Sequence, residues 1–233
     1  MSFLLDYVRA AEARHEAGDA AAWGAGIHVP FAGRLDLQQG VGIVGHSFGA
    51  ATAVTAARQD PRISACVAHD LWMLPLSSDF KKQGLRPRGD DDGGRANNPF
   101  SLLITQSRKW TEWGEQNREM LAFTRASGDA TLIDFPATAH SNYSDVPLFA
   151  PMLARKMGQI GAADFRQAMN DINEAQTEFL VHKMQEQHSS SSNGSSNGGS
   201  VTAEAGQAAK KQFEALLGSG RAVLLARSGE AAK

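Results

Sequence analysis

A short apolar run that passes directly into a Gly-His-Ser-Phe-Gly motif is the feature that most constrains the fold of this chain. Residues 41–45 (VGIVG) carry no polar side chain, which is typical of a strand buried on both faces of a parallel sheet. The residues that follow, 48–58, are small and Ala-rich and predict a closely packed helix. Strand, tight turn and helix in this order form the context in which a G-x-S-x-G pentapeptide becomes a nucleophile elbow.

The predicted elbow makes Ser47 the candidate nucleophile. Such a turn lifts the serine hydroxyl above the edge of the sheet and points the N-terminus of the following helix at the reaction centre. We expect glycine at both position 45 and position 49 because side chains there would collide with neighbouring backbone. The competing interpretation is a Gly-rich turn whose serine only caps the helix.

Strand and helix patterns alternate along the rest of the chain. Apolar runs predict strands over residues 63–69, 101–106 and 130–135, and periodic apolar positions predict helices over 2–17 and 113–126 and a long helix through 165–184. This alternation predicts an α/β fold with a mainly parallel sheet and flanking helices.

Two polar segments of the chain are not expected to be packed in the core. Residues 81–98 are Gly-rich and are expected to form a mobile surface insertion. Residues 188–200 (Ser-, Gly- and Asn-rich) are expected to form a flexible linker. The predicted organisation is therefore a partial α/β domain over 1–187, the linker, and an Ala-rich tail over 201–233 that could be helical but has little to bury.

Composition excludes several classes of function. The chain has 23 basic and 25 acidic side chains and a formal charge of −2, so nucleic-acid binding, which usually needs a basic face, is not expected. Its single cysteine, Cys66, cannot form an internal disulfide. Ser2 stands where N-myristoylation requires glycine. Neither a signal peptide nor a membrane-spanning stretch is seen, which makes the cytoplasm the default expectation.

Ser47 needs a histidine to take its proton and a carboxylate to orient that histidine. In this kind of fold the chain order is serine, acid, histidine, and Asp70 and His140 each follow a predicted strand. Glu112 is the second candidate acid, and Asp145 is interpreted as a surface residue. No cluster of histidines, cysteines and carboxylates has metal-ligand spacing, so no metal is expected. Structural or solvent-facing roles are expected for the remaining downstream and motif histidines, His46, His69, His182 and His188.

Three sequence blocks resemble the platelet-activating factor acetylhydrolase family, the plasma and type II intracellular group of α/β hydrolases. Residues 41–52 resemble its nucleophile block, 68–76 (AHDLWMLPL) its acid block and 140–145 (HSNYSD) its histidine block. The Trp-Met-Leu-Pro-Leu run is the most specific part, because generic α/β hydrolases lack it. The resemblance covers roughly residues 2–185 and corresponds to the C-terminal half of the family.

The resemblance implies a serine esterase that hydrolyses the short sn-2 acyl ester of platelet-activating-factor-like phospholipids to a lysophospholipid and acetate. It implies Ser47 as nucleophile, His140 as general base and Asp70, rather than Glu112, as the orienting acid. The backbone N–H of Phe48 would be one oxyanion donor. No cofactor is implied, and the phospholipid could be met at a membrane or lipid-particle surface.

Two alternatives stay open. Family members carry a large upstream half that supplies the second oxyanion donor, whereas only 46 residues precede Ser47 here. The chain could therefore be a truncated or inactive pseudo-hydrolase that binds lipid or a partner, or a carboxylesterase of soluble esters. The apolar side chains of the Trp-Met-Leu-Pro-Leu run either line an acyl pocket or a lipid-facing rim, or belong to the core.

Overall fold

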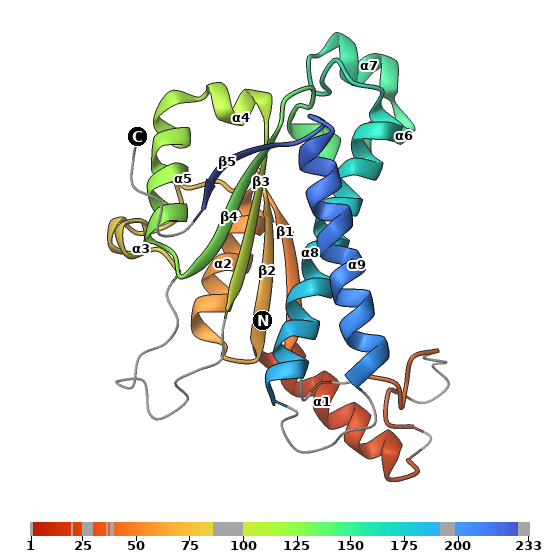
Figure 1. Ribbon diagram of the computed structural model, residues 1–233. Helices are drawn as coiled ribbons and strands as arrows, with labels where there is room; N and C mark the ends of the chain where they lie inside the picture. Colours follow the sequence, from red (N-terminus) through yellow and green to blue (C-terminus); the bar gives the residue numbers. More distant parts are fainter. Residues whose placement is uncertain are drawn as a thin grey trace.

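A five-stranded sheet forms the centre of the computed structural model, with the strands lying in the order in which they occur in the chain (Figure 1). Strands β1 to β4 are parallel and β5 is antiparallel to β4. The strands are β1 (Val41–His46), β2 (Ile63–His69), β3 (Ser101–Ser107), β4 (Asp129–Phe135) and β5 (Val223–Arg227). The predicted α/β fold with a mainly parallel sheet is confirmed. The structure describes residues 2–19, 21–24, 30–35, 37, 40–85, 100–191 and 199–227.

Helices cover both faces of the sheet, with α2 and α5 on one face and α8 and α9 on the other (Figure 1). The helices expected over 2–17, 48–58 and 113–126 are found as α1, α2 and α5. The helical elements are α1 (Ser2–Glu16), α2 (Phe48–Gln59), α3 (Ser78–Gln83), α4 (Arg108–Glu112), α5 (Gly114–Ala126), η2 (His140–Tyr143), α6 (Val146–Phe149), α7 (Pro151–Lys156), α8 (Phe165–Ser191) and α9 (Gly199–Gly218). Among the helices of the described residues, none combines the length and the apolar character that crossing a bilayer requires.

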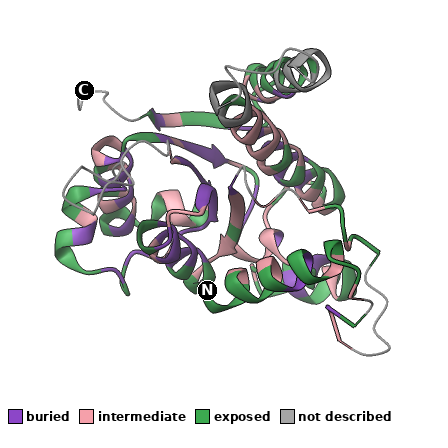
Figure 2. Cartoon of the chain, turned by 90° about the horizontal axis from the view of Figure 1, so that it is seen from below, coloured by how far each residue is buried: buried purple, intermediate pink, exposed green. Residues whose placement is uncertain are grey.

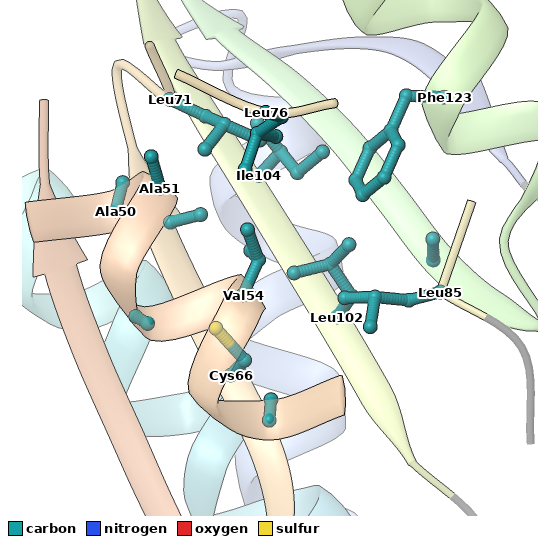
Figure 3. Close-up of a cluster of buried hydrophobic side chains, with 14 of the residues drawn as sticks. Ala50, Ala51, Val54, Cys66, Leu71, Leu76, Leu85, Leu102, Ile104 and Phe123 are labelled. Carbon is teal, nitrogen blue, oxygen red and sulfur yellow. The ribbon is translucent and has the colours of Figure 1, made fainter. Parts of the chain in front are cut away.

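Two apolar cores lie on opposite faces of the sheet, as the alternation of side chains along a strand requires. In β2, Cys66 and Ala68 face the core beneath α2 and α5 (Figure 3), whereas Ala65 and Val67 face the core beneath α8 and α9. Every residue of β2 and β3 is buried, and the purple strands of Figure 2 show this burial at the centre of the molecule. Burial on both faces explains why these strands read as continuous apolar runs. It also raises the pKa of the Cys66 thiol.

Strand β1 differs from the expectation of a strand buried on both faces. It is the edge strand of the sheet, it is only half-buried, and the Val44 side chain is 45% exposed. Helix α8 covers one of its faces, since Leu180 Cδ2 would lie 3.1 Å from a side chain added at Gly42. The apolar run therefore predicted the parallel sheet correctly but not the partial exposure of this strand.

The two polar segments are only partly described. Of the expected insertion 81–98, residues up to 83 belong to α3, and Leu85 is buried in the core beneath α2 and α5. That part of the prediction is wrong because Lys81 pairs with Glu119 and Leu85 packs inward. Residues 86–99 lie outside the described residues.

The tail is part of the described fold. Helix α9 packs on α8, and its Leu216 is fully buried among residues of β2, β3 and β4. Strand β5 then extends the sheet beyond β4. The expectation that the tail has little to bury is wrong, because its small residues, such as Ala222 and Ala226, allow close packing. Of the expected linker 188–200, both flanks are helical and 192–198 lies outside the described residues.

Candidate active site

The turn between β1 and α2 holds Ser47 in a strained backbone conformation. Its φ is 58° and its ψ is −120°, a combination that non-glycine residues rarely adopt and that is found mainly at functional sites. The Ser47 N–H donates to the His69 carbonyl at 2.9 Å, which ties the turn to the end of β2. The Ser47 side chain makes no capping hydrogen bond to α2. The geometry is that of a nucleophile elbow, and the helix-cap interpretation has no support from it.

The two glycines of the motif differ in what they contribute. A Cβ at Gly45 would lie 2.3 Å from the Gly49 carbonyl oxygen and 2.8 Å from the Ala50 nitrogen, distances that backbone atoms cannot accept. At Gly49 nothing lies within 4 Å of an added Cβ. The steric reason expected for both glycines therefore holds at Gly45 and is wrong at Gly49.

Asp70 follows β2 directly and is fully buried. Its backbone has a positive φ of 42°, a conformation that aspartate tolerates better than most side chains. Ser107, the last residue of β3, donates from its N–H to Asp70 Oδ1 at 2.6 Å and from its hydroxyl to Oδ2 at 2.8 Å. Sequence reasoning did not single out Ser107, because nothing in its local pattern marks the end of β3 as a hydrogen-bond donor.

His140 begins the short helix η2 after β4, and its Nδ1 lies 2.8 Å from Asp70 Oδ2. An ionised carboxylate only accepts hydrogen bonds, so Nδ1 carries the proton and Nε2 is left as the basic nitrogen. The side chain is 30% exposed. The hydrogen bonds among the described residues include none between Ser47 and His140.

His46 lies against His140, which the sequence did not indicate. Its Nε2 is 3.4 Å from His140 Nδ1, and the two ring centroids are 4.3 Å apart. Burial and the neighbouring His140 lower the pKa of His46 from 6.5 to about 4, so its imidazole is neutral near pH 7. The His46 ring also stacks on the Tyr143 ring, with centroids 5.6 Å apart.

His46, Asp70 and His140 form a group whose potential metal-ligand atoms lie within 4.8 Å of one another. Sequence spacing could not show this group because its members come from the ends of three different strands. Both Asp70 oxygens already accept hydrogen bonds, and His140 Nδ1 donates one of them. Hydrogen bonding therefore accounts for the cluster without a metal ion.

Residues 29–200 match the sequence family described as "Platelet-activating factor acetylhydrolase, isoform II". The chain belongs to this family. The match contains the elbow, the aspartate that follows β2 and the histidine that begins η2, so the three resembling blocks are found within one family match. The earlier resemblance to platelet-activating factor acetylhydrolases is confirmed.

Curated relatives in this family are of modest identity. The platelet-activating factor acetylhydrolase of Cavia porcellus is 25% identical over 149 residues, which cover 64% of this chain and 30% of that protein. That of Gallus gallus is 23% identical over 141 residues, covering 60% and 30%. That of Canis lupus familiaris is 26% identical over 144 residues, covering 60% and 28%. The chain thus spans about 30% of the length of these relatives.

A solved structure shows the same fold. The ferulic acid esterase from Streptomyces cinnamoneus superposes with a TM-score of 0.53 at 18% identity, over 94% of this chain and 55% of that one. At this identity the likeness shows the fold alone.

The acid block of this acetylhydrolase-family chain divides between core and surface. Met73 and Leu76 are buried, whereas Leu74 is exposed and Trp72 lies edge-on to the exposed Phe48 at 6.3 Å. Beside Phe48, a groove of about 280 Å³ runs along α2 to Pro75 and Leu76. The core interpretation of the Trp-Met-Leu-Pro-Leu run therefore holds for Met73 and Leu76, and a role of Trp72 and Leu74 toward an acyl chain or a lipid surface stays a prediction.

Neither of the other two acids is hydrogen-bonded to His140 in the described part of the chain. Glu112 ends α4, and in the described part of the chain it makes no hydrogen bond to His140. Asp145 lines a second cavity, of about 370 Å³, with His46, His69 and residues of α8. The acid in contact with His140 is Asp70.

Proposed function

We propose that this chain is a serine esterase that hydrolyses the short sn-2 acyl ester of platelet-activating-factor-like phospholipids. Family membership supports the reaction class, and the names of the curated relatives support the substrate class. The observation that carries the proposal is the hydrogen bond between Asp70 Oδ2 and His140 Nδ1 at 2.8 Å, at the same sheet edge as the strained Ser47.

In the proposed mechanism Ser47 Oγ attacks the acyl carbonyl while His140 Nε2 takes its proton. Asp70 holds the other ring nitrogen and stabilises the imidazolium that forms. The negative oxygen of the tetrahedral intermediate accepts a hydrogen bond from the Phe48 N–H, at the start of α2. The ester C–O bond then breaks, and His140 returns the proton to the lysophospholipid oxygen.

Water completes the cycle by attacking the acyl-serine. His140 takes one proton from the water, the second tetrahedral intermediate collapses, and acetate leaves as Ser47 recovers its proton. Asp70 can serve both half-reactions without moving, because Ser107 fixes both of its oxygens. The mechanism draws on Ser47, His140 and Asp70, with the Phe48 N–H as one of the oxyanion donors.

A lipid surface as the place of reaction is supported by apolar side chains beside the site. Helices α6 and α7 follow η2 and lie beyond the edge of the sheet at which α4 begins (Figure 1). Phe149 is 83% exposed and Met152 is 86% exposed. We call this group the α6–α7 patch; its members are Val146, Leu148, Phe149, Met152, Leu153 and Met157. Exposed apolar surface of this kind marks contact with lipid or protein.

The alternative proposal is a lipid-binding domain without turnover. Its support is that no hydrogen bond joins Ser47 to His140 in the described part of the chain. Catalytic hydrogen bonds are often long in unliganded sites and tighten with substrate, so we favour the esterase.

Covalent labelling with a fluorophosphonate ester tests the proposal. Wild type should be labelled, Ser47→Ala should not, and Ser78→Ala, an exposed serine of α3, should match wild type. Asp70→Asn should lower the labelling rate by about 10³–10⁴-fold, whereas Glu112→Gln should leave it unchanged. Absence of labelling in a folded wild type would support the non-catalytic alternative.

Substrate class is a separate measurement. Rates should be compared for a phosphatidylcholine with a short sn-2 chain and for a soluble p-nitrophenyl ester. Faster turnover of the phospholipid is expected. Turnover of the soluble ester alone would make the protein a general carboxylesterase and remove the phospholipid from the proposal.

A further inference from the structure

Trp110 lies flat against the imidazole of His140. The ring centroids are 4.4 Å apart and the planes differ by 3°, so the indole face covers one side of the imidazole. Trp110 comes from α4, which begins directly after Ser107 at the end of β3. The segment that orients Asp70 thus also supplies the aromatic ring beside His140.

The indole is itself held in place. Its Nε1–H donates to the Leu71 carbonyl at 3.1 Å, and Gln116 Nε2 donates to the same oxygen at 2.7 Å. Leu71 follows Asp70 in the chain. The indole ring and the Asp70 carboxylate both contact His140, and both are attached to the same turn after β2, the indole through its hydrogen bond to Leu71.

We infer that Trp110 is a positioning residue for His140, which holds the imidazole against Asp70 and favours its protonated form during acyl transfer. This inference rests on the proposed function for the role of His140. An aromatic face attracts a cation lying over it, and the attraction is larger away from water. His140 becomes a cation when it accepts the serine proton. The attraction between Trp110 and His140 is therefore strongest in the transition state of acyl transfer.

The charges around His140 agree with this role. Asp70 contacts it from the end of β2 and is the anionic partner. His46 contacts it from the end of β1 and is kept neutral near pH 7 by burial. Among the described residues, His140 thus contacts one anion, one neutral imidazole and the indole face, all of which tolerate an imidazolium.

Two substitutions and a matched control separate positioning from general packing. Trp110→Leu removes the aromatic face, whereas Trp110→Phe keeps a smaller aromatic ring and loses the hydrogen bond to Leu71. Trp113→Leu is the control, since Trp113 packs edge-on against Trp110 at 5.5 Å and is half-exposed. Thermal unfolding shows that each variant is folded before it is compared.

The fluorophosphonate labelling rate should fall about tenfold in Trp110→Leu, remain within about threefold of wild type in Trp110→Phe, and change little in Trp113→Leu. The acid limb of its pH profile should move to lower pH by roughly half a unit in Trp110→Leu, because the imidazolium loses a favourable contact. Equal losses in the two leucine variants, with an unmoved pH profile, would overturn the inference.

Imidazole NMR gives a readout that does not depend on a reactive serine. The His140 ring signals, assigned with His140→Asn, should titrate at lower pH in Trp110→Leu than in Trp113→Leu. If wild type is never labelled, the esterase proposal fails while this titration still decides the role of Trp110. If labelling succeeds and the titration is the same in both variants, only the inference about Trp110 fails.

Discussion

Ser107 donates hydrogen bonds to both carboxylate oxygens of Asp70, from its backbone at 2.6 Å and from its hydroxyl at 2.8 Å. The two residues end neighbouring parallel strands, so the sheet itself brings them together. With these bonds made, Oδ2 is directed toward His140. A serine with no role in the chemistry thereby sets the orientation of the acid.

Ser107→Ala should lower the fluorophosphonate labelling rate by about tenfold, because one of the two donors that orient the buried carboxylate is lost. The backbone donor remains, so the loss should be smaller than that in Asp70→Asn. Ser101→Ala is the control, since Ser101 at the other end of β3 donates to Asp129 Oδ2 at 2.6 Å. A rate in Ser107→Ala equal to that in Ser101→Ala would contradict this role.

Gly45→Ala and Gly49→Ala should have opposite effects on stability. The first places a Cβ 2.3 Å from the Gly49 carbonyl oxygen and should cost more than about 2 kcal/mol of unfolding free energy. The second adds a methyl group to open space within α2 and should stabilise by about 0.5–1 kcal/mol. Urea unfolding of the two variants measures both values, and a stable Gly45→Ala would show that the elbow can relax.

Acid should destabilise the fold through His69. Burial lowers the pKa of His69 from 6.5 to about 4, so between these values the unfolded chain binds a proton that the folded chain does not. Above about pH 6.5 this residue adds no pH dependence, and by pH 4 it should cost about 3 kcal/mol. Denaturant unfolding at several pH values should show this loss.

A matched histidine provides the control for that measurement. His69→Asn should flatten the acid decline, whereas His182→Gln, on α8 beside Glu186, should not. His69 also bridges Thr105 and Gln176 at 2.7 and 2.8 Å, so the comparison uses the slope with pH and not the stability at neutral pH. An unchanged slope in His69→Asn would assign the acid sensitivity to other groups.

Phe149→Ser should weaken binding to phosphatidylcholine vesicles by about tenfold, because the variant lacks the aromatic ring whose transfer from water into the bilayer favours binding. Phe3→Ser is the matched control, since Phe3 on α1 is equally exposed, at 83%. In Figure 1, α1 lies at the opposite end of the molecule from α6 and α7. Sedimentation with vesicles measures both variants, and equal losses would show that the α6–α7 patch has no special part in binding.

Leu216→Ala tests whether the C-terminal helix belongs to the same cooperative fold as the sheet. Leu216 is fully buried beneath β3 and β4, so the substitution should cost about 2–5 kcal/mol of unfolding free energy. Leu224→Ala, on β5 and 37% exposed, should cost much less. Equal and small effects would mean that α9 contributes little to stability.

Local sequence patterns predicted the elements that surround the site. The strand expected over 63–69 is found with the same bounds, and those expected over 101–106 and 130–135 differ by one residue at one end. Apolar runs and small-residue helices are set by burial on both faces of a sheet, which a single segment already displays. Strand β5 was missed because a short antiparallel edge strand, three of whose five residues are exposed, has no apolar pattern that separates it from an unstructured C-terminal segment.

The contacts around His140 could not be predicted in the same way. Trp110 and Ser107 reach His140 and Asp70 through the register of β2 on β3 and the direction of α4. His46 was expected to have a structural role, and its contact with His140 depends on where η2 returns to the sheet. Such contacts join distant parts of the chain, so periodicity does not reveal them.

The order of the strands has a consequence for how a newly made chain acquires its chemistry. Ser47 follows the first strand, Asp70 the second and His140 the fourth, and each strand lies beside the one made before it. During synthesis the serine is therefore present long before the histidine that would activate it. Any reactivity of the proposed triad must wait until β4 has joined the sheet and brought His140 to its edge. A probe that reacts only with the activated serine would then report this step of folding.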